Sequence, residues 1–412
     1  MNELSLNSKP SGTVTTSQRL FHTRIGISSF YLVAGLIFAS WASRIPDIKV
    51  LLNLTDGDLG KILFAIPTGQ LMMMFLSGYL VNKFGSRITL LISITMYALV
   101  LVFISFSNNF GTIFLVLFFF GTAANMINIA LNTQACGLEA LYNRNIMSSF
   151  HGLWSLGGLS GGIIGAIFVH AGQSILTHYT FIAIVCFILV AIGSRHLITN
   201  ESTLKNNCEK NSKSLSKLDL PIILLGLIGF GGMFCEGTMF DWSSVYFATI
   251  VKPDESLVRL GYIAGMGTMT IGRFIADRFV SRYQAPTVLK FCGLLIISGL
   301  LLTVAFPYLI TSTLGFMLVG LGISSIVPIC YSVAGKSSSY SASIAITIVS
   351  SISFLGFMIG PPLIGLLSEA TNLRIALAIA SSFGLLIIIF ADKYQSIKTE
   401  KYENRTLGNL GR

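Results

Sequence analysis

The sequence predicts an all-α membrane protein whose twelve transmembrane helices form two six-helix pseudo-repeat bundles, with both termini in the cytoplasm. Of the 412 residues, 53% are apolar and 11% are charged, whereas ordinary globular proteins carry about 25% charged residues. Residues 88–138, 145–194, 291–335 and 337–368 contain no Asp, Glu, Lys or Arg at all. These two observations exclude a soluble enzyme, a secreted disulfide-linked domain and a disordered chain.

Twelve spans fit this pattern, because a helix needs about 20 mostly apolar residues to cross a bilayer. Allowing about 2–4 residues of uncertainty at each end, we place them at 25–43, 58–81, 88–107, 111–135, 148–170, 178–195, 220–248, 254–276, 286–305, 309–332, 342–367 and 373–392. The longest polar stretch follows the sixth span. We therefore predict a polar cytoplasmic N-terminus (1–24), an N-terminal six-helix bundle (25–196), a cytoplasmic linker (197–219), a C-terminal six-helix bundle (220–392) and a cytoplasmic tail (393–412).

The basic residues orient these spans. Of the 27 Lys and Arg residues, 21 fall on the side of the termini and the linker, and the other side has only Arg44, Lys49, Lys61, Lys252, Arg259 and Arg374. Loops rich in Lys and Arg stay in the cytoplasm, so this asymmetry predicts cytoplasmic termini. It also accounts for the net charge of +10 without a nucleic-acid partner.

The two halves repeat each other. Trp41 precedes Gly60 by 19 residues, and Trp242 precedes Gly261 by the same distance. Glycines 157 and 161 in the fifth span have counterparts at 356 and 360 in the eleventh, and Gly165 follows in the fifth span. Small residues let helices approach closely, so we expect these glycines to serve packing. Parallel repeats of six helices are typical of one class of transporters.

The loop after the second span carries a motif of glycines and basic residues, and the loop after the eighth span carries a partial copy. In both, the sequence resembles the major facilitator superfamily, whose motif here matches Gly78, Lys83, Gly85 and Arg87, then Gly272, Arg273, Asp277 and Arg278. Asn82 stands where that motif has an acid. The resemblance implies a conformational latch at the cytoplasmic helix ends, formed by Gly78, Lys83, Arg87, Arg273, Asp277 and Arg278; the alternative is that these bases only set the topology.

Three longer strings place the chain nearer to one branch of that superfamily. Residues 41–46, residues 149–158 and residues 236–243 are similar to the bacterial MosC-like, sugar-permease-like branch. That resemblance implies a multi-pass protein of the bacterial inner membrane that moves a small polar solute.

Two acids lie in the seventh span. Ionisable groups inside a membrane are costly and are functional candidates by default. Because desolvation disfavours a carboxylate, Glu236 is our candidate for proton coupling; the alternative is a permanently protonated acid in an interhelical hydrogen bond. Asp241 is a candidate for substrate binding, or alternatively for a structural pair with Arg44 or Arg259.

Polar and aromatic side chains in other spans supply the remaining substrate-binding candidates. Asn125, Asn128 and Asn132 fall on one stripe of the fourth span, where they bind a polyol or sugar or hold helices together. His151 and Trp154 share a face of the fifth span and suit a sugar ring. Trp41 and Trp242 either stack on the solute or simply pack.

We therefore expect a secondary active transporter of a small hydrophilic solute such as a sugar, polyol or amino sugar, working by alternating access and coupled to protons. No nucleotide-binding loop is present, and we expect no catalytic residue, metal or cofactor and no partner chain. A drug or metabolite efflux antiporter of the same superfamily remains an alternative, as does a receptor that kept the fold. An enzyme is disfavoured, because the sequence shows no nucleophile that is paired with a base at the same depth in the membrane.

Overall fold

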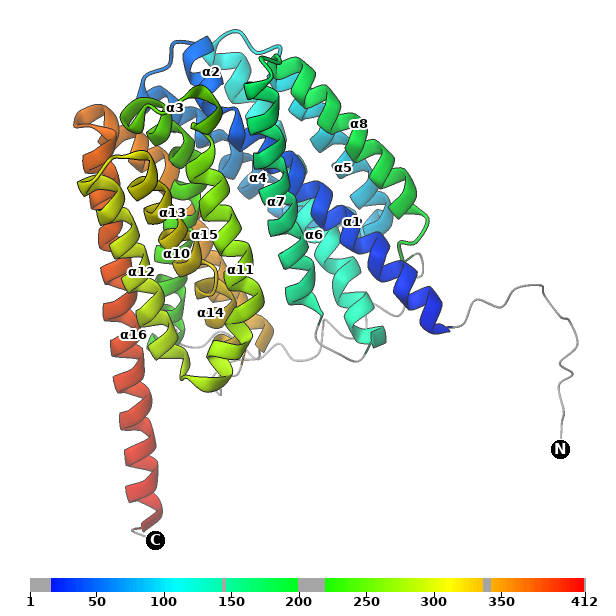
Figure 1. Cartoon of the computed structure of the whole chain (residues 1–412). Helices are drawn as coiled ribbons and strands as arrows, with labels where there is room; N and C mark the ends of the chain where they lie inside the picture. Colours follow the sequence, from blue (N-terminus) through cyan, green and yellow to red (C-terminus); the bar gives the residue numbers. More distant parts are fainter. Residues whose placement is uncertain (1–15, 143–145, 199–218, 336–341, 411–412) are drawn as a thin grey trace, which may run out of the picture.

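The N-terminal half consists of helices only. The computed structural model describes residues 16–142, 146–198, 219–335 and 342–410. Up to residue 198 it contains α1 (Thr16–Ser43), α2 (Ile45–Leu51), α3 (Asp56–Leu63), α4 (Ala65–Phe84), α5 (Ser86–Ile104), α6 (Phe110–Tyr142), α7 (Met147–His170) and α8 (Ile175–Ser194). These helices form one bundle, with the short α2 and α3 at one end (Figure 1).

The C-terminal half forms a second bundle beside the first (Figure 1). It contains α10 (Leu220–Tyr246), a π-helical turn (Phe247–Val251), a 3-10 turn (Glu255–Leu257), α11 (Leu260–Arg282), α12 (Ala285–Ala305), α13 (Leu309–Ile323), α14 (Ile326–Ala334), α15 (Ala342–Ala370) and α16 (Leu373–Leu410). The start of α1 and the end of α16 lie at the same end of the molecule, opposite α2 and α3. We call the end with α2 and α3 the far end.

The prediction of an all-α membrane protein is confirmed, but the count of twelve spans is not. Within the described residues, ten helices are long and apolar enough to cross a membrane, or eleven if the bent pair Asp56–Met74 and Leu76–Phe84 is one span. Helix α11, our eighth span, does not meet the same test. The last helix also continues to Leu410, beyond the predicted end of the twelfth span at residue 392.

Two of the predicted spans are broken where a proline follows. The second span divides into α3 and α4 at Phe64, three residues before Pro67, and the tenth divides into α13 and α14 at residues 324–325, just before Pro328. Proline lacks an N–H and its ring collides with the carbonyl four residues earlier. The helical hydrogen-bond ladder therefore cannot run through either position unchanged.

Glycines set the closest helix contacts in both halves, as the repeated spacing predicted. A Cβ on Gly157 of α7 would overlap the carbonyl oxygen of Leu32 in α1, and one on Gly356 of α15 would overlap that of Phe230 in α10. The pairs α1–α7 and α10–α15 are therefore equivalent contacts in the two repeats, and both depend on the absence of a side chain.

Candidate functional site

Helix α7 lies between its own bundle and the other one. One set of its glycines faces α1. A second set faces α11 and consists of Gly152, Gly158 and Gly162. A Cβ added to these glycines would meet, in that order, the α11 side chains Phe274, Met266 and Tyr262. With no side chains in the way, α11 of the C-terminal half packs directly on α7 of the N-terminal half. This contact places the polar residues of both helices at the boundary between the bundles.

An ion pair lies at this boundary. Nη2 of Arg273 in α11 is 3.2 Å from Oε1 of Glu236 in α10. The same guanidinium donates through Nη1 to Oγ of Ser155 in α7. Glu236 is only 7% exposed, and Nε of Arg273 has no hydrogen-bond partner. The network therefore joins α7, α10 and α11 across the two halves, deep in the protein.

This geometry changes the reading of Arg273. The sequence analysis assigned Arg273 to the second latch, at the cytoplasmic helix ends. The structure instead turns it inward onto Glu236 and Ser155. A charged group inside a membrane protein faces the interior and pairs with another, and among the described side chains Glu236 is the acid that pairs with Arg273.

A line of polar side chains runs along α6 toward α1 and α7. The amide of Asn132 donates to Oδ1 of Asn128, and the hydroxyl of Tyr31 in α1 donates to Oδ1 of Asn132 at 2.6 Å. The Tyr31 ring meets His151 edge-on, with centroids 5.5 Å apart. The structure thus brings together three of the predicted residues, and Asn128 and His151 are exposed.

Asn125 lies apart from this line in its contacts. Its Oδ1 accepts a hydrogen bond of 2.8 Å from Ser77 in α4. This contact corresponds to the interhelical alternative that the sequence left open for the Asn stripe.

An aromatic cluster bridges the two bundles next to the ion pair. We call Phe38, Trp154, Phe240 and Tyr262 the aromatic bridge. Phe38 lies 5.8 Å from Trp154 and 5.5 Å from Phe240, and Phe240 lies 6.1 Å from Tyr262, between ring centroids. Two of these rings belong to each half. Trp154 is half-buried whereas the other three are buried, so it is the ring with a free surface.

Asp241 is buried beside this bridge. It is 7% exposed, and the hydroxyl of Tyr262 in the bridge lacks a hydrogen-bond partner. Neither Arg44 nor Arg259 pairs with Asp241, because both contact Asp47 instead. In the described part of the chain, Asp241 forms no ion pair.

The two equivalent tryptophans, Trp41 and Trp242, are both fully buried. Nε1 of Trp242 donates to the carbonyl of Pro361 in α15 at 3.0 Å, and Nε1 of Trp41 has no partner. Neither indole presents a face to a solute in this conformation, so their positions fit the packing alternative.

Within the described residues, the hydrogen bond and ring contacts of the first latch lie in its own half. Nη2 of Arg87 donates to the carbonyl of Ser194 at the end of α8. Lys83 lies over the rings of Tyr79 and Phe84, and Gly78 has open space around it. The side chains of Asp277 and Arg278, from the second latch, lie outside the described residues.

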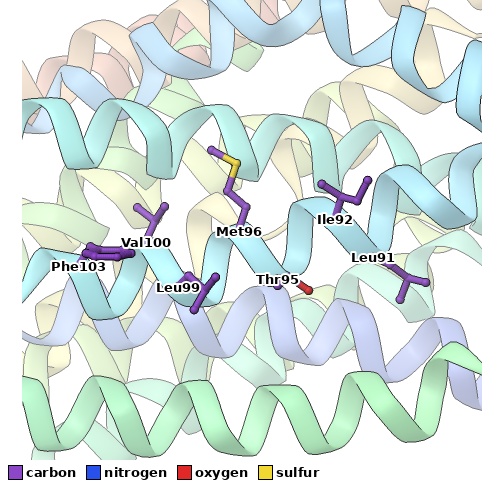
Figure 2. Close-up of a pocket in the computed structure, with 7 residues that line it drawn as sticks. All are labelled: Leu91, Ile92, Thr95, Met96, Leu99, Val100 and Phe103. Atoms are coloured by element: carbon purple, nitrogen blue, oxygen red, sulfur yellow. The ribbon is translucent and has the colours of Figure 1, made fainter.

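A surface groove on α5 does not belong to this site. Figure 2 shows its side chains along one helix, and they are Leu91, Ile92, Thr95, Met96, Leu99, Val100 and Phe103. Thr95 alone among them is polar. An apolar, exposed helix face of this kind suits acyl chains rather than a hydrophilic solute.

Sequence reasoning missed Tyr31, Ser155 and three members of the aromatic bridge. One signal could have found the pairing of Arg273: the eighth span has an arginine inside its apolar sequence, and the adjacent seventh span has an acid, Glu236. The others gave no signal, because a Tyr, Ser or Phe in an apolar span is ordinary.

The chain matches known proteins over most of its length. The model of the Major Facilitator Superfamily matches residues 26–345. An uncharacterized MFS-type transporter of Yersinia pestis is 30% identical over 349 residues, covering 84% of this chain and 89% of that protein. Membrane protein MosC of Rhizobium meliloti is 29% identical over 403 residues, covering 95% of each. The resemblance to the MosC-like branch is thereby confirmed.

The chain also matches one more distant transporter sequence and the folds of two solved structures. The glucose/mannose transporter GlcP of Bacillus subtilis is 22% identical and covers 90% of this chain and 94% of that protein. The solved structure of the nucleoside transporter NupG superposes with a TM-score of 0.70 at 14% identity, covering 91% of this chain and 98% of that one. A bacterial homologue of the human lysosomal transporter Spinster gives 0.66 at 12% identity, covering 94% and 98%. The two structures share the fold.

Proposed function

Given that the chain belongs to the Major Facilitator Superfamily and is a multi-pass membrane transporter, we propose that it moves a small hydrophilic solute by alternating access, coupled to protons. The observation that carries this proposal is the Glu236–Arg273–Ser155 network. It is the place where a solute and a proton can both act on the two halves at once.

Glu236 is the proposed coupling residue. Removing one partner of a buried ion pair leaves the other charge uncompensated, which costs about 3–5 kcal/mol. Protonation of Glu236 therefore removes the charge that compensates Arg273, so that a new hydrogen-bond acceptor for the guanidinium becomes favourable. A solute hydroxyl or carbonyl oxygen is such an acceptor. Proton binding and solute binding then favour each other, which is the condition for coupled transport.

The surroundings favour a sugar-like solute. Asn128, Asn132 and His151 offer donors and acceptors from the N-terminal half, Asp241 offers an acceptor from the other half, and Trp154 offers a ring face. The named solutes of GlcP and NupG, a hexose and a nucleoside, have this combination of hydroxyls and a flat or ring-shaped body. We propose that the solute binds between the bundles, against the aromatic bridge.

A thermal-shift screen of the purified protein against glucose, mannose, polyols, amino sugars and uridine identifies the solute. Uptake of the radiolabelled hit into proteoliposomes with an imposed pH gradient then tests coupling. We expect Glu236→Gln to bind the solute and exchange it across the membrane but to lose uphill accumulation. Undiminished accumulation by this variant contradicts the coupling role. Binding without exchange by the wild type favours a receptor, and accumulation only in inside-out vesicles favours efflux.

A further inference from the structure

Asp47, at the far end, is shared by two arginines from different halves. Nη1 of Arg44, which precedes α2 in the same half, lies 3.5 Å from Oδ2 of Asp47. Arg259, which precedes α11 in the other half, bonds the same oxygen. Arg259 is 1% exposed, and its Nε donates to the carbonyl of Ser43 at 3.0 Å. Its guanidinium is therefore buried against the opposite bundle, while its Nη1 also donates to the carbonyl of Glu255 in its own half at 3.3 Å.

Arg44, unlike Arg259, is held entirely by its own half. Its Nε donates to Nδ1 of His178 at 3.3 Å, and its Nη2 donates to the carbonyl of Gln173 at 2.9 Å. If the bundles separated at the far end, Arg259 would leave with its own half. Arg44 would stay beside Asp47.

Asp56 repeats this arrangement at the start of α3. Lys49 of the same half pairs with its Oδ1, and Ser368 of α15 in the other half donates to its Oδ2. Glycines make the approach possible, since a Cβ on Gly365 would lie 2.6 Å from the Asp56 carbonyl oxygen. Two carboxylates of the α2–α3 corner thus each have one base in their own half and one donor from the other half.

We infer that Asp47 and Asp56 form a two-point clasp that closes the far end, and that Arg44 and Lys49 make the clasp reversible. A carboxylate that loses its only partner in a poorly solvated site is strongly disfavoured. Because each acid keeps a base of its own half, opening breaks the contact with Arg259 or Ser368 without leaving an unpaired carboxylate. Arg259 and Ser368 stabilise the closed state, whereas Arg44 and Lys49 stabilise the open one.

The inference rests on the alternating access proposed above, but its test needs neither a solute nor a proton gradient. Val50 on α2 and Ile310 on α13 are 75% and 73% exposed and lie in different halves. Nitroxide labels on cysteines at these positions, in a background without the native cysteines, report the width of the far end by pulsed electron paramagnetic resonance in nanodiscs. A separate thermal melt shows that each variant is folded.

We expect Arg259→Gln to increase the ratio of long to short distances about tenfold or more, in line with the loss of a charge-assisted bond. Ser368→Ala is expected to act in the same direction. Adding Arg44→Gln to Ser368→Ala is expected to reverse the shift, because the open state then leaves Asp47 unpaired. Should the Arg44 variant fail to fold, Lys49→Gln added to Arg259→Gln provides the same test for Asp56. The open state then leaves Asp56 unpaired, so the shift toward long distances is again expected to reverse.

Lys61→Gln is the matched control, since Lys61 forms an exposed pair with Asp58 inside α3 only. It should leave the distances unchanged. An Arg259→Gln distribution identical to that of the wild type overturns the clasp. A further shift toward long distances on adding Arg44→Gln or Lys49→Gln overturns their role in reversibility.

Discussion

The Glu236–Arg273 pair makes a quantitative prediction about stability. The two charged atoms lie 3.2 Å apart, where the direct attraction is about 5 kcal/mol at an effective dielectric constant of about 20. Removing both groups from water offsets most of this gain. The pair as a whole should therefore contribute little to the free energy of unfolding, whereas burying either charged group without the other is costly.

We expect Glu236→Gln and Arg273→Gln each to lower the free energy of unfolding by about 3–5 kcal/mol. Both variants should still fold, since glutamine retains a hydrogen-bonding group at either position. The double variant buries no unpaired charge, so it should be no less stable than either single variant. This corresponds to a coupling energy at least as large as the larger single effect, about 3–5 kcal/mol.

Equilibrium unfolding by SDS in mixed micelles, followed by circular dichroism, measures these four proteins. The exposed pair between Lys61 and Asp58 is the matched control, and Lys61→Gln should change stability by less than about 1 kcal/mol. If the two single effects add to within about 0.5 kcal/mol in the double variant, Glu236 and Arg273 do not act as a unit, and the coupling mechanism built on them fails.

Three further predictions concern binding and packing. Asn128→Ala should weaken the affinity for the solute found in the screen. Gln134→Ala should leave affinity unchanged and lower the thermal midpoint, because the buried Gln134 amide bonds the backbone N–H and carbonyl of Ile198, beyond the end of α8; reversed effects would contradict the Asn stripe. Trp242→Phe should destabilise the fold by about 1–3 kcal/mol because it removes a buried hydrogen bond and leaves a small cavity, while Trp41→Phe removes an N–H that has no partner and should cost less; equal losses in thermal unfolding would argue against this. Gly157→Ala should destabilise the fold by about 1–3 kcal/mol through overpacking against α1, measured by the same melt, and an unchanged midpoint would show that the helices can separate without cost.

The local features of the fold were predictable from the sequence. Long stretches without charge locate helices, because the cost of burying charge in a bilayer depends on each segment by itself. The glycine spacing in residues 157–165 and 356–360 predicted close helix contacts for a similar reason, since a missing side chain has the same effect wherever the partner helix comes from. The breaks before Pro67 and Pro328 could have been predicted by the same local rule, but the spans were drawn through them.

The candidate site was only partly predictable. Glu236 was identified correctly as a buried acid, but its partner Arg273 was assigned to a latch because its neighbours resemble a family motif. The equivalent tryptophans show the limit most directly. Trp41 and Trp242 occupy the same place in the two repeats, yet only the second finds a carbonyl for its indole N–H.

The sequence by itself determined that this protein is helical, lies in a membrane and consists of two related halves, because these properties follow from the composition and spacing of short segments. Tertiary structure alone decided which charges meet. Asp47 and Arg259 are 212 residues apart in the chain, and their contact depends on how two bundles are rotated and packed against each other. Such a pairing depends on the positions of many side chains together, which no single segment of the sequence encodes.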